Sequence, residues 1–392
     1  MKIGILTFVH AFNYGAELQC FALQRKLRNM GYDVEVLDTY RPNDKEYVKN
    51  KKEDKKFKQL YKFTSKSDVK SRINSIIARV LSKILELFYK KEYKTRHYNF
   101  LQFHKDYTSL SNKHYYNFSE LYKESELPYS HMIVGSDQVW NYMNEFSVEP
   151  FFLTFADGCK KISYAASIGH SDVPICLHNK YAEWIKDFDY ISLREQQGVK
   201  IIKEISGRND VICTLDPTLL LTKDDWIKCL NIEISDREPY IIMYLLSKSS
   251  YSIDLAKQIA KAHNLKIKIV STAAISIDKD PDLEYYDGVS PREFISLFAN
   301  ASFAITNSFH GTAFSINFNV PFYATTRSTK RYNSRFINLL ELTGLSDRLI
   351  YEDKNEEMKS RNDDFSISFE FGNMALSKER EKSIDFLTSS LK

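Results

Sequence analysis

The run around His310 combines a hydroxyl, an imidazole and a glycine where a predicted strand, Phe303–Thr306, gives way to a predicted helix, 312–318. Backbone N–H groups at a helix N-terminus favour anions such as phosphate or carboxylate. An imidazole can donate a proton near neutral pH. We therefore expect an anion-binding loop with His310 as a catalytic acid; the alternative is a capped helix with a structural histidine. The donor-binding residues expected here are Asn307, Ser308, Gly311 and Thr312, with Gly311 letting the backbone approach a ligand closely.

Arg194 follows an apolar run, 191–193, that is typical of a strand, so its guanidinium should emerge at the carboxyl end of that strand. A guanidinium binds phosphate or carboxylate through two parallel hydrogen bonds. We expect Arg194 to hold such an anion at the catalytic centre. The alternative is that Arg194 and Glu195 belong to surface ion pairs, which are common and weak.

The segment 135–141 also follows a predicted strand, 132–134, and offers a carboxylate and an indole. Asp137 is a candidate catalytic base, with helix capping as the alternative. Trp140 is a candidate acceptor-binding residue because sugars stack on aromatic rings, but core packing of a tryptophan explains it equally well.

The loop after the first predicted strand contains Asn13, Tyr14 and Gly15, which we assign as candidate acceptor-binding residues. The alternative is structural, with Asn13 near a helix N-cap and Gly15 allowing close packing. This loop lacks the GxGxxG pattern, so nicotinamide or flavin binding is not supported. We expect no cofactor.

A cationic loop follows the predicted strand 321–324 and includes Arg331 and Arg335. Its proximity in sequence to the His310 loop suits a polyanionic donor, so both arginines are assigned to donor binding. An ordinary basic surface loop is the alternative.

These loops need strands to position them, and the hydrophobic runs supply two series. A strand over 2–8, a helix over 15–30 and a strand over 34–37 form a βαβ unit. Further strand-like runs alternate with helical patterns, so we predict an α/β protein with two doubly wound Rossmann-like domains facing a cleft. The domains are 1–215 on the acceptor side and 216–375 on the donor side, with a helix over 376–392 packing back on the first.

Composition narrows the function classes. A chain of 392 residues is too long for one hydrophobic core, so two domains are expected. Its share of apolar residues, 43%, is typical of a globular protein. The net charge of +4 is too small to indicate nucleic acid. The five cysteines form no CxxC pair, so neither a metal site nor a disulfide framework is expected. We find no signal peptide or membrane-spanning run and expect a cytoplasmic protein.

Residues 41–105 differ from the rest of the chain. Lysines crowd 49–58, and amphipathic patterns follow over 73–88 and 93–103, which predict a helical insertion with a basic surface in the first domain. A solvated helix face is one explanation, and peripheral contact with the anionic inner surface of the membrane is the other.

Seven segments, in this order, resemble the polysaccharide pyruvyl transferase family, and together they span roughly residues 2–350. No single segment is specific for the family, whereas all seven in the same order are. The lysine-rich insertion and His170 depart from the family pattern and put the identity of the acceptor in doubt. The segments are 4–8 (GILTF), 13–16 (NYGA), 135–141 (GSDQVWN), 163–169 (SYAASIG), 192–195 (SLRE), 215–220 (LDPTLL) and 306–312 (TNSFHGT).

The resemblance implies a glycosyltransferase-B-like fold and phosphoenolpyruvate as the donor substrate. The expected product is a pyruvate ketal on two hydroxyls of a sugar, in a precursor of a capsule or exopolysaccharide. The acceptor would then be a sugar or a lipid-linked oligosaccharide. The family's functional histidine and arginine fall on His310 and Arg194.

Two other functions remain open at this point. A nucleotide-sugar-dependent glycosyltransferase of the same architecture would also place phosphate at the His310 loop. A non-catalytic sugar- or lipid-binding protein would keep the fold but would not need His310 and Arg194 in one cleft.

Overall fold

The computed structural model describes residues 1–40, 90–144, 148–235, 238–271, 279–328, 333–354 and 365–392. These fall into two compact units. The first contains the described residues within Met1–Tyr61, His104–Leu221 and Leu376–Lys392, and the second those within Lys62–Phe103 and Thr222–Ala375. The lysine-rich segment and the predicted helix over 73–88 lie outside the described residues.

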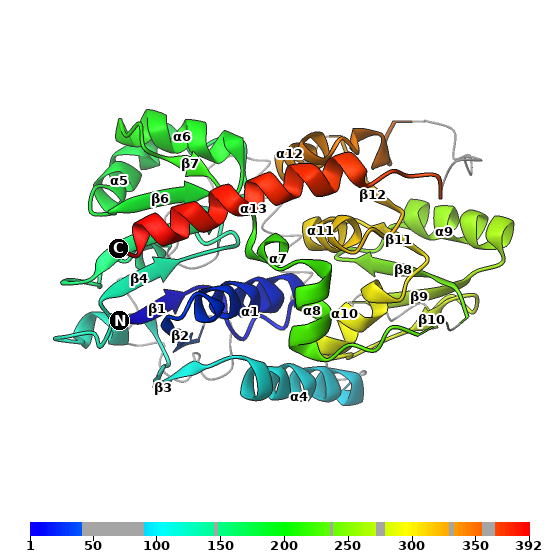
Figure 1. Ribbon diagram of the computed structural model, residues 1–392, viewed down its shortest axis with the longest axis horizontal. Helices are drawn as coiled ribbons and strands as arrows, with labels where there is room; N and C mark the ends of the chain where they lie inside the picture. The colour runs from blue at the N-terminus through cyan, green and yellow to red at the C-terminus, as the bar shows by residue number, and fades with distance from the viewer. Residues whose placement is uncertain (41–89, 145–147, 236–237, 272–278, 329–332, 355–364) are drawn as a thin grey trace. The chain divides into compact units, whose positions relative to one another are not determined.

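The first unit is built on a seven-stranded parallel sheet with the order β3-β2-β1-β4-β5-β6-β7 (Figure 1). The chain therefore runs outward from β1 in one direction and then returns to continue from β4 in the other. The strands are β1 (Lys2–Leu6), β2 (Asp33–Thr39), β3 (Leu110–Tyr115), β4 (His131–Val134), β5 (Lys160–Ala166), β6 (Tyr190–Leu193) and β7 (Ile212–Cys213).

Helices bury the two faces of this sheet in separate cores. One core joins the sheet to α1 (Tyr14–Asn29), to α7 (Pro217–Leu220) and to the end of α13 (Glu370–Ser390). The other core includes buried residues of α5 (Ile175–Ile185) and α6 (Gln196–Ser206). Both faces are covered, as an all-parallel sheet requires.

The second unit repeats the plan with a six-stranded parallel sheet in the order β10-β9-β8-β11-β12-β13. The first three strands, starting with β8, are added toward one edge of the sheet. The last three, starting with β11, are added toward the other edge. The strands are β8 (Tyr240–Leu245), β9 (Lys266–Ser271), β10 (Glu284–Tyr285), β11 (Phe303–Thr306), β12 (Phe322–Thr326) and β13 (Leu349–Tyr351). The helices are α8 (Lys223–Leu230), α9 (Ser250–His263), α10 (Pro291–Ala299), α11 (Phe309–Asn317) and α12 (Ser334–Thr343).

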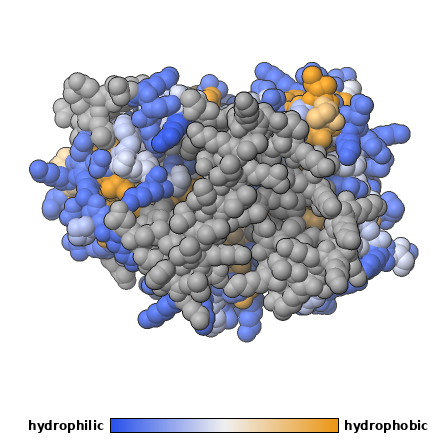
Figure 2. Space-filling model, turned by 180° about the vertical axis from the view of Figure 1, so that it is seen from behind, coloured by the Kyte–Doolittle hydropathy of each residue, from blue (hydrophilic) through white to orange (hydrophobic). Residues whose placement is uncertain are grey.

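The helix α4 (Lys90–Tyr107) includes the predicted helix over 93–103. On the face drawn in Figure 2, the coloured residues are mostly hydrophilic, with a few small hydrophobic spots. Scattered exposed apolar side chains are normal on a protein surface. None of the helices in the described ranges combines the length and the apolar composition that a membrane span needs.

The two doubly wound sheets and most of their strands were predicted from the sequence and are confirmed. The strands β3, β10 and β13 were not predicted. The expected boundary between the domains was at 215/216, whereas the first unit continues to Leu221. The expected helix after β11 starts earlier than predicted, at Phe309 instead of 312.

Candidate active site

In the first unit, β1 and β4 are neighbours although the chain leaves them in opposite directions across the sheet. Ligands of doubly wound folds bind outside the carboxyl ends of strands at such a switch point. Gln19 of α1 ties the two loops there, because its side chain accepts from Ser136 N at 2.9 Å and donates to Thr7 Oγ1 at 2.9 Å. Thr7 Oγ1 also donates to the Ser136 carbonyl at 3.2 Å.

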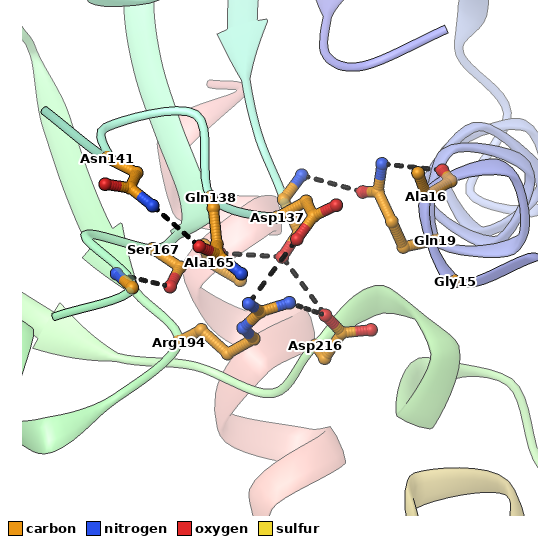
Figure 3. Close-up of polar contacts among 12 residues, drawn as sticks. Gly15, Ala16, Gln19, Asp137, Gln138, Asn141, Ala165, Ser167, Arg194 and Asp216 are labelled. Atoms are coloured by element: carbon orange, nitrogen blue, oxygen red, sulfur yellow. Dashed lines mark hydrogen bonds and ion pairs between the residues drawn. The ribbon is translucent and has the colours of Figure 1, made fainter. Parts of the chain in front are cut away.

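Arg194 follows β6 and points its guanidinium into a cluster of carboxylates (Figure 3). Its Nη1 lies 2.8 Å from Asp216 Oδ2, its Nη2 lies 3.6 Å from Asp137 Oδ1, and its Nε lies 4.0 Å from Glu195 Oε2. The side chain is only 2% exposed. The alternative that Arg194 and Glu195 belong to surface ion pairs is therefore wrong, because the ion pairs of Arg194 are buried. Burial alone would lower the pKa of Arg194, but Asp216, Asp137 and Glu195 raise it, so the group is cationic.

Two of these carboxylates are held by further donors. Asp216 caps α7 by accepting from Thr218 N at 3.0 Å, and it also accepts from Ser136 Oγ at 3.2 Å. Glu195 accepts from Ser167 Oγ at 2.9 Å and Ile168 N at 3.1 Å. These donors hold both carboxylates in place beside Arg194. Arg194 thus joins the ends of β4, β5 and β6 to α7.

Asp137 is the most exposed carboxylate of this group, with 15% of its side chain accessible. Its backbone φ is +70°, a left-handed conformation that only a small share of non-glycine residues adopts. The conformation is held from both sides, since its carbonyl accepts from Val139 N at 2.8 Å and Ser167 N at 2.9 Å. Asp137 is therefore a fixed carboxylate at the carboxyl end of β4, in a suitable place for a base.

The loop before α1 has the capping role that was the alternative explanation. Asn13 is the N-cap, and its side chain accepts from Gly15 N at 2.9 Å and Ala16 N at 3.3 Å. Tyr14 is 1% exposed and Gly15 is buried, so of the three residues Asn13 has the most accessible side chain.

Trp140 is enclosed in the core of the first unit. Its ring stacks on Phe152 with centroids 4.7 Å apart and meets Phe188 edge-on at 5.6 Å. Its Nε1 donates to the carbonyl of Phe151 at 2.8 Å, and no part of the residue is exposed. These contacts match the core-packing alternative, so a sugar cannot stack on this ring and we leave Trp140 out of the acceptor site.

In the second unit, the equivalent switch point lies between β8 and β11. Asn307 links the two loops, since its Oδ1 accepts from Leu246 N at 2.7 Å and its Nδ2 donates to the carbonyl of Ser247 at 2.9 Å. Its amide is therefore engaged in positioning the loops.

Ser308 is the N-cap of α11 and accepts from Gly311 N at 3.4 Å. Thr312 is fully buried and donates to the carbonyl of Ser308 at 3.2 Å. A Cβ on Gly311 would lie 2.2 Å from Thr306 Oγ1. The glycine thus permits close packing of α11 on β11, whereas the sequence analysis assigned that freedom to the approach of a ligand.

His310 lies in the first turn of α11 and is 7% exposed. The preceding Phe309 lies edge-on to it at 5.3 Å, and the guanidinium carbon of Arg335, on α12, lies 5.9 Å from the Phe309 ring centroid. The structure thus brings Arg335 to the His310 loop, whereas Arg331 lies outside the described residues. His310 and Arg194 belong to different units, and their expected meeting in one cleft remains a prediction.

Three polar residues at these switch points escaped the sequence analysis as site residues. Gln19 and Asp216 carry the contacts above, and His10 pairs with a carboxylate described below. They could not be recognised because their partners are far away in sequence. The one available signal was that His10 lies in the loop after the first predicted strand, where ligands are expected to bind. Among the described residues, no group of three or more His, Cys, Asp or Glu side chains is arranged to hold a metal ion.

Comparison with solved structures identifies the architecture. UDP-GlcNAc 2-epimerase from Neisseria meningitidis, bound to UDP-GlcNAc, is 10% identical, covers 99% of this chain and 100% of its own, and has a TM-score of 0.51. UDP-GlcNAc 2-epimerase from Methanocaldococcus jannaschii is 10% identical over the same shares, with a TM-score of 0.50. At such identities the likeness shows the fold alone, which is glycosyltransferase-B-like with two Rossmann-like domains.

No curated protein matches the chain. A family model does, and its range includes Asp137, Arg194 and His310. The model is that of polysaccharide pyruvyl transferase, and it matches residues 13–329, well over half of the sequence. The chain therefore belongs to the polysaccharide pyruvyl transferase family.

Proposed function

We propose that this enzyme transfers the pyruvyl group of phosphoenolpyruvate to two hydroxyls of a sugar and so forms a pyruvate ketal. Membership of the family supports pyruvyl transfer. Phosphoenolpyruvate is a compact anion, and the N-terminal turn of α11 is suited to bind its phosphate or carboxylate.

The observation that carries the proposal is the position of His310. It lies in the first turn of α11, at the carboxyl end of β11 and beside the switch point of the second sheet. An acid placed there can reach an anion bound at the helix N-terminus. Arg335, which lies against Phe309, supplies a cation next to the same turn.

The reaction needs a proton on C3 of phosphoenolpyruvate, so that C2 becomes electrophilic. In this proposal His310 gives that proton, and Arg335 and Arg331 hold the donor's negative oxygens. Arg194 keeps the catalytic centre of the first unit charged and ordered, and Asp137 accepts a proton from a sugar hydroxyl. The first unit, including the accessible Asn13, binds the acceptor.

The acceptor is a sugar or a lipid-linked oligosaccharide used for a cell-surface polysaccharide, and we expect no cofactor and no nucleic acid. A lipid-linked acceptor would bring the enzyme to the inner surface of the cytoplasmic membrane. The basic segment over 49–58 suits such a surface by its charge.

A thermal-shift screen tests the donor. Phosphoenolpyruvate far above its dissociation constant should stabilise the protein by a few kcal/mol, with a corresponding rise in melting temperature. Nicotinamide cofactors should give no shift. A clear shift with NAD and none with phosphoenolpyruvate would overturn the choice of donor.

A nucleotide-sugar-dependent glycosyltransferase is the second candidate, because the fold is shared with an enzyme whose structure holds UDP-GlcNAc. The two reactions release different products. Pyruvyl transfer releases inorganic phosphate, whereas glycosyl transfer releases a nucleotide, so the product released identifies the donor class.

A further inference from the structure

His10 follows β1 at its carboxyl end, in the loop that leads to α1 and next to the switch point of the first sheet. The residue is 5% exposed, and its backbone φ of +55° is left-handed. A left-handed non-glycine residue persists only where its surroundings hold it. The chain therefore presents this imidazole in a fixed conformation where a ligand of the first unit is expected to bind.

A buried carboxylate orients the imidazole. His10 Nε2 lies 2.5 Å from Asp38 Oδ1, and the Asp38 side chain is only 3% exposed. Asp38 stands near the carboxyl end of β2, the strand beside β1. A proton on Nε2 that is donated to Asp38 leaves the lone pair on Nδ1, the tautomer that can accept another proton.

The second oxygen of the same carboxylate binds another histidine. His114, on β3, stands directly opposite Asp38 in the register of the two strands, and its Nδ1 contacts Asp38 Oδ2. The His114 side chain is 52% exposed. Asp38 thus joins a buried imidazole to one that reaches solvent. Burial alone would raise the pKa of Asp38, but His10 and His114 lower it, so the bridging group is a carboxylate.

The other groups around His10 are an aromatic ring and a second ion pair. Tyr40 stacks on the imidazole with centroids 4.7 Å apart, and the ring of His104, from α4, lies at 5.3 Å. His104 Nε2 lies 2.8 Å from Glu17 Oε2. Glu17 also accepts from Ala11 N at 3.0 Å, which ties the His10 loop to α1. His10 therefore lies between the Asp38 carboxylate and the pair of His104 and Glu17.

We propose that His10 is a base that removes a proton from an acceptor hydroxyl. Asp38 is its positioning residue, and His114 is the solvent-exposed histidine on the other oxygen of Asp38. The ligand class is a sugar hydroxyl. The inference builds on the proposed function, but it needs only transfer to a hydroxyl and therefore holds for either class of donor.

The proton count of ketal formation requires such a group. C3 gains one proton, and two new bonds form between C2 and the sugar oxygens as both O–H bonds break. The bond between C2 and the phosphate oxygen breaks, and phosphate leaves with the electron pair. One hydroxyl proton balances the proton taken up at C3, and the other accompanies the phosphate into solution. Because two hydroxyl protons must be removed, His10 and Asp137 both have a proton to accept.

The test is His10→Gln in the full chain, because the glutamine amide can still donate to Asp38 but cannot act as a base. Transfer to a sugar acceptor should fall by about 100-fold, while the melting temperature and the shift produced by phosphoenolpyruvate stay unchanged. The wild-type rate should rise with pH where an imidazole loses its proton, and the variant should lack this rise. His178→Gln, in the same unit and bonded to the Val173 carbonyl at 2.9 Å, is the matched control.

Activity within about twofold of wild type, with the same pH profile, would overturn the proposal. If the wild type uses a nucleotide sugar and not phosphoenolpyruvate, the proposed donor fails, while the same variants still decide the role of His10. If His10→Gln does not fold, or if neither donor is consumed, histidine-selective NMR of the wild type decides. Saccharide should shift the ring signals of His10, and unchanged signals at saturating saccharide would reject the assignment.

Discussion

The guanidinium Nη1 of Arg194 lies 2.8 Å from Asp216 Oδ2, and this buried pair connects the end of β6 to the N-cap of α7. Because Asp216 also accepts from Ser136 Oγ, the pair reaches the loop that carries Asp137. The arginine that the family resemblance marks as functional is therefore part of the framework that fixes a candidate base.

Arg194→Lys should weaken both stability and turnover. Lysine keeps the positive charge but loses the planar fork that meets Asp216 and Asp137 at once. We expect a loss of about 1–3 kcal/mol of unfolding free energy and a fall of at least about tenfold in kcat/KM. Arg208→Lys, at a partly exposed pair with Asp210, is the control. Donor KM and turnover that both stay within about twofold of wild type would contradict the role.

Gly311→Ala tests whether the glycine serves packing. The new Cβ would lie 2.2 Å from Thr306 Oγ1, which itself donates to the Tyr244 carbonyl at 2.6 Å. Overpacking should lower the free energy of unfolding by about 1–3 kcal/mol. This loss should exceed the roughly 1 kcal/mol by which alanine is favoured over glycine in a helix interior. Chemical denaturation measures the loss, with Ser315→Ala on the same helix as the milder change. An unchanged denaturation midpoint for Gly311→Ala would show that α11 can move away from β11.

The pair of His104 and Glu17 should make stability depend on pH. Burial alone would lower the pKa of His104, but Glu17 raises it above the ordinary value of 6.5. A histidine whose pKa is raised on folding contributes its full share of stability at pH values below the ordinary pKa. That contribution is lost as the pH rises through the pKa of the folded state. The pKa of Glu17 is lowered below 4.5, because His104 and His10 outweigh the effect of burial. Its contribution is present above 4.5 and is lost as the pH falls through the lowered value.

His104→Gln should therefore destabilise the protein by about 2 kcal/mol near pH 6, and by less as the pH rises above the raised pKa of His104. Denaturation curves across that range measure the effect. His97→Gln, at an exposed position on the same helix, should cost less than about 0.5 kcal/mol at every pH. A cost for His104→Gln that is constant from pH 6 to 9 would show that the pair acts through packing alone.

His310→Gln should keep the fold and much of the donor binding but lose turnover by about two to four orders of magnitude. The glutamine fits the same turn of α11 and cannot give a proton to C3. His263→Gln, at the end of α9, is the control for replacing a histidine in the same unit. Full activity of His310→Gln would leave the turn from Ser308 to Gly311 as a scaffold element.

The strands with apolar runs could be predicted from the sequence, and β11 was found with its observed bounds. The strand β3 could not, because three successive residues of its Leu110–Tyr115 segment are exposed and polar, so no alternation marks it. Trp140 stayed ambiguous because sugar stacking and core packing select the same residue type. His10 and Asp38 are 28 positions apart, and only the pairing of β1 with β2 brings them together.

The most direct test of pyruvyl transfer is to incubate the purified protein with phosphoenolpyruvate and a panel of sugar acceptors, and to measure phosphate and product together. The account predicts that inorganic phosphate appears in equal amount with an acid-labile pyruvate ketal on the sugar, and that His310→Gln forms both about two to four orders of magnitude more slowly. Release of a nucleotide from a nucleotide sugar by the wild type, with no ketal formed from phosphoenolpyruvate on any acceptor, would contradict it.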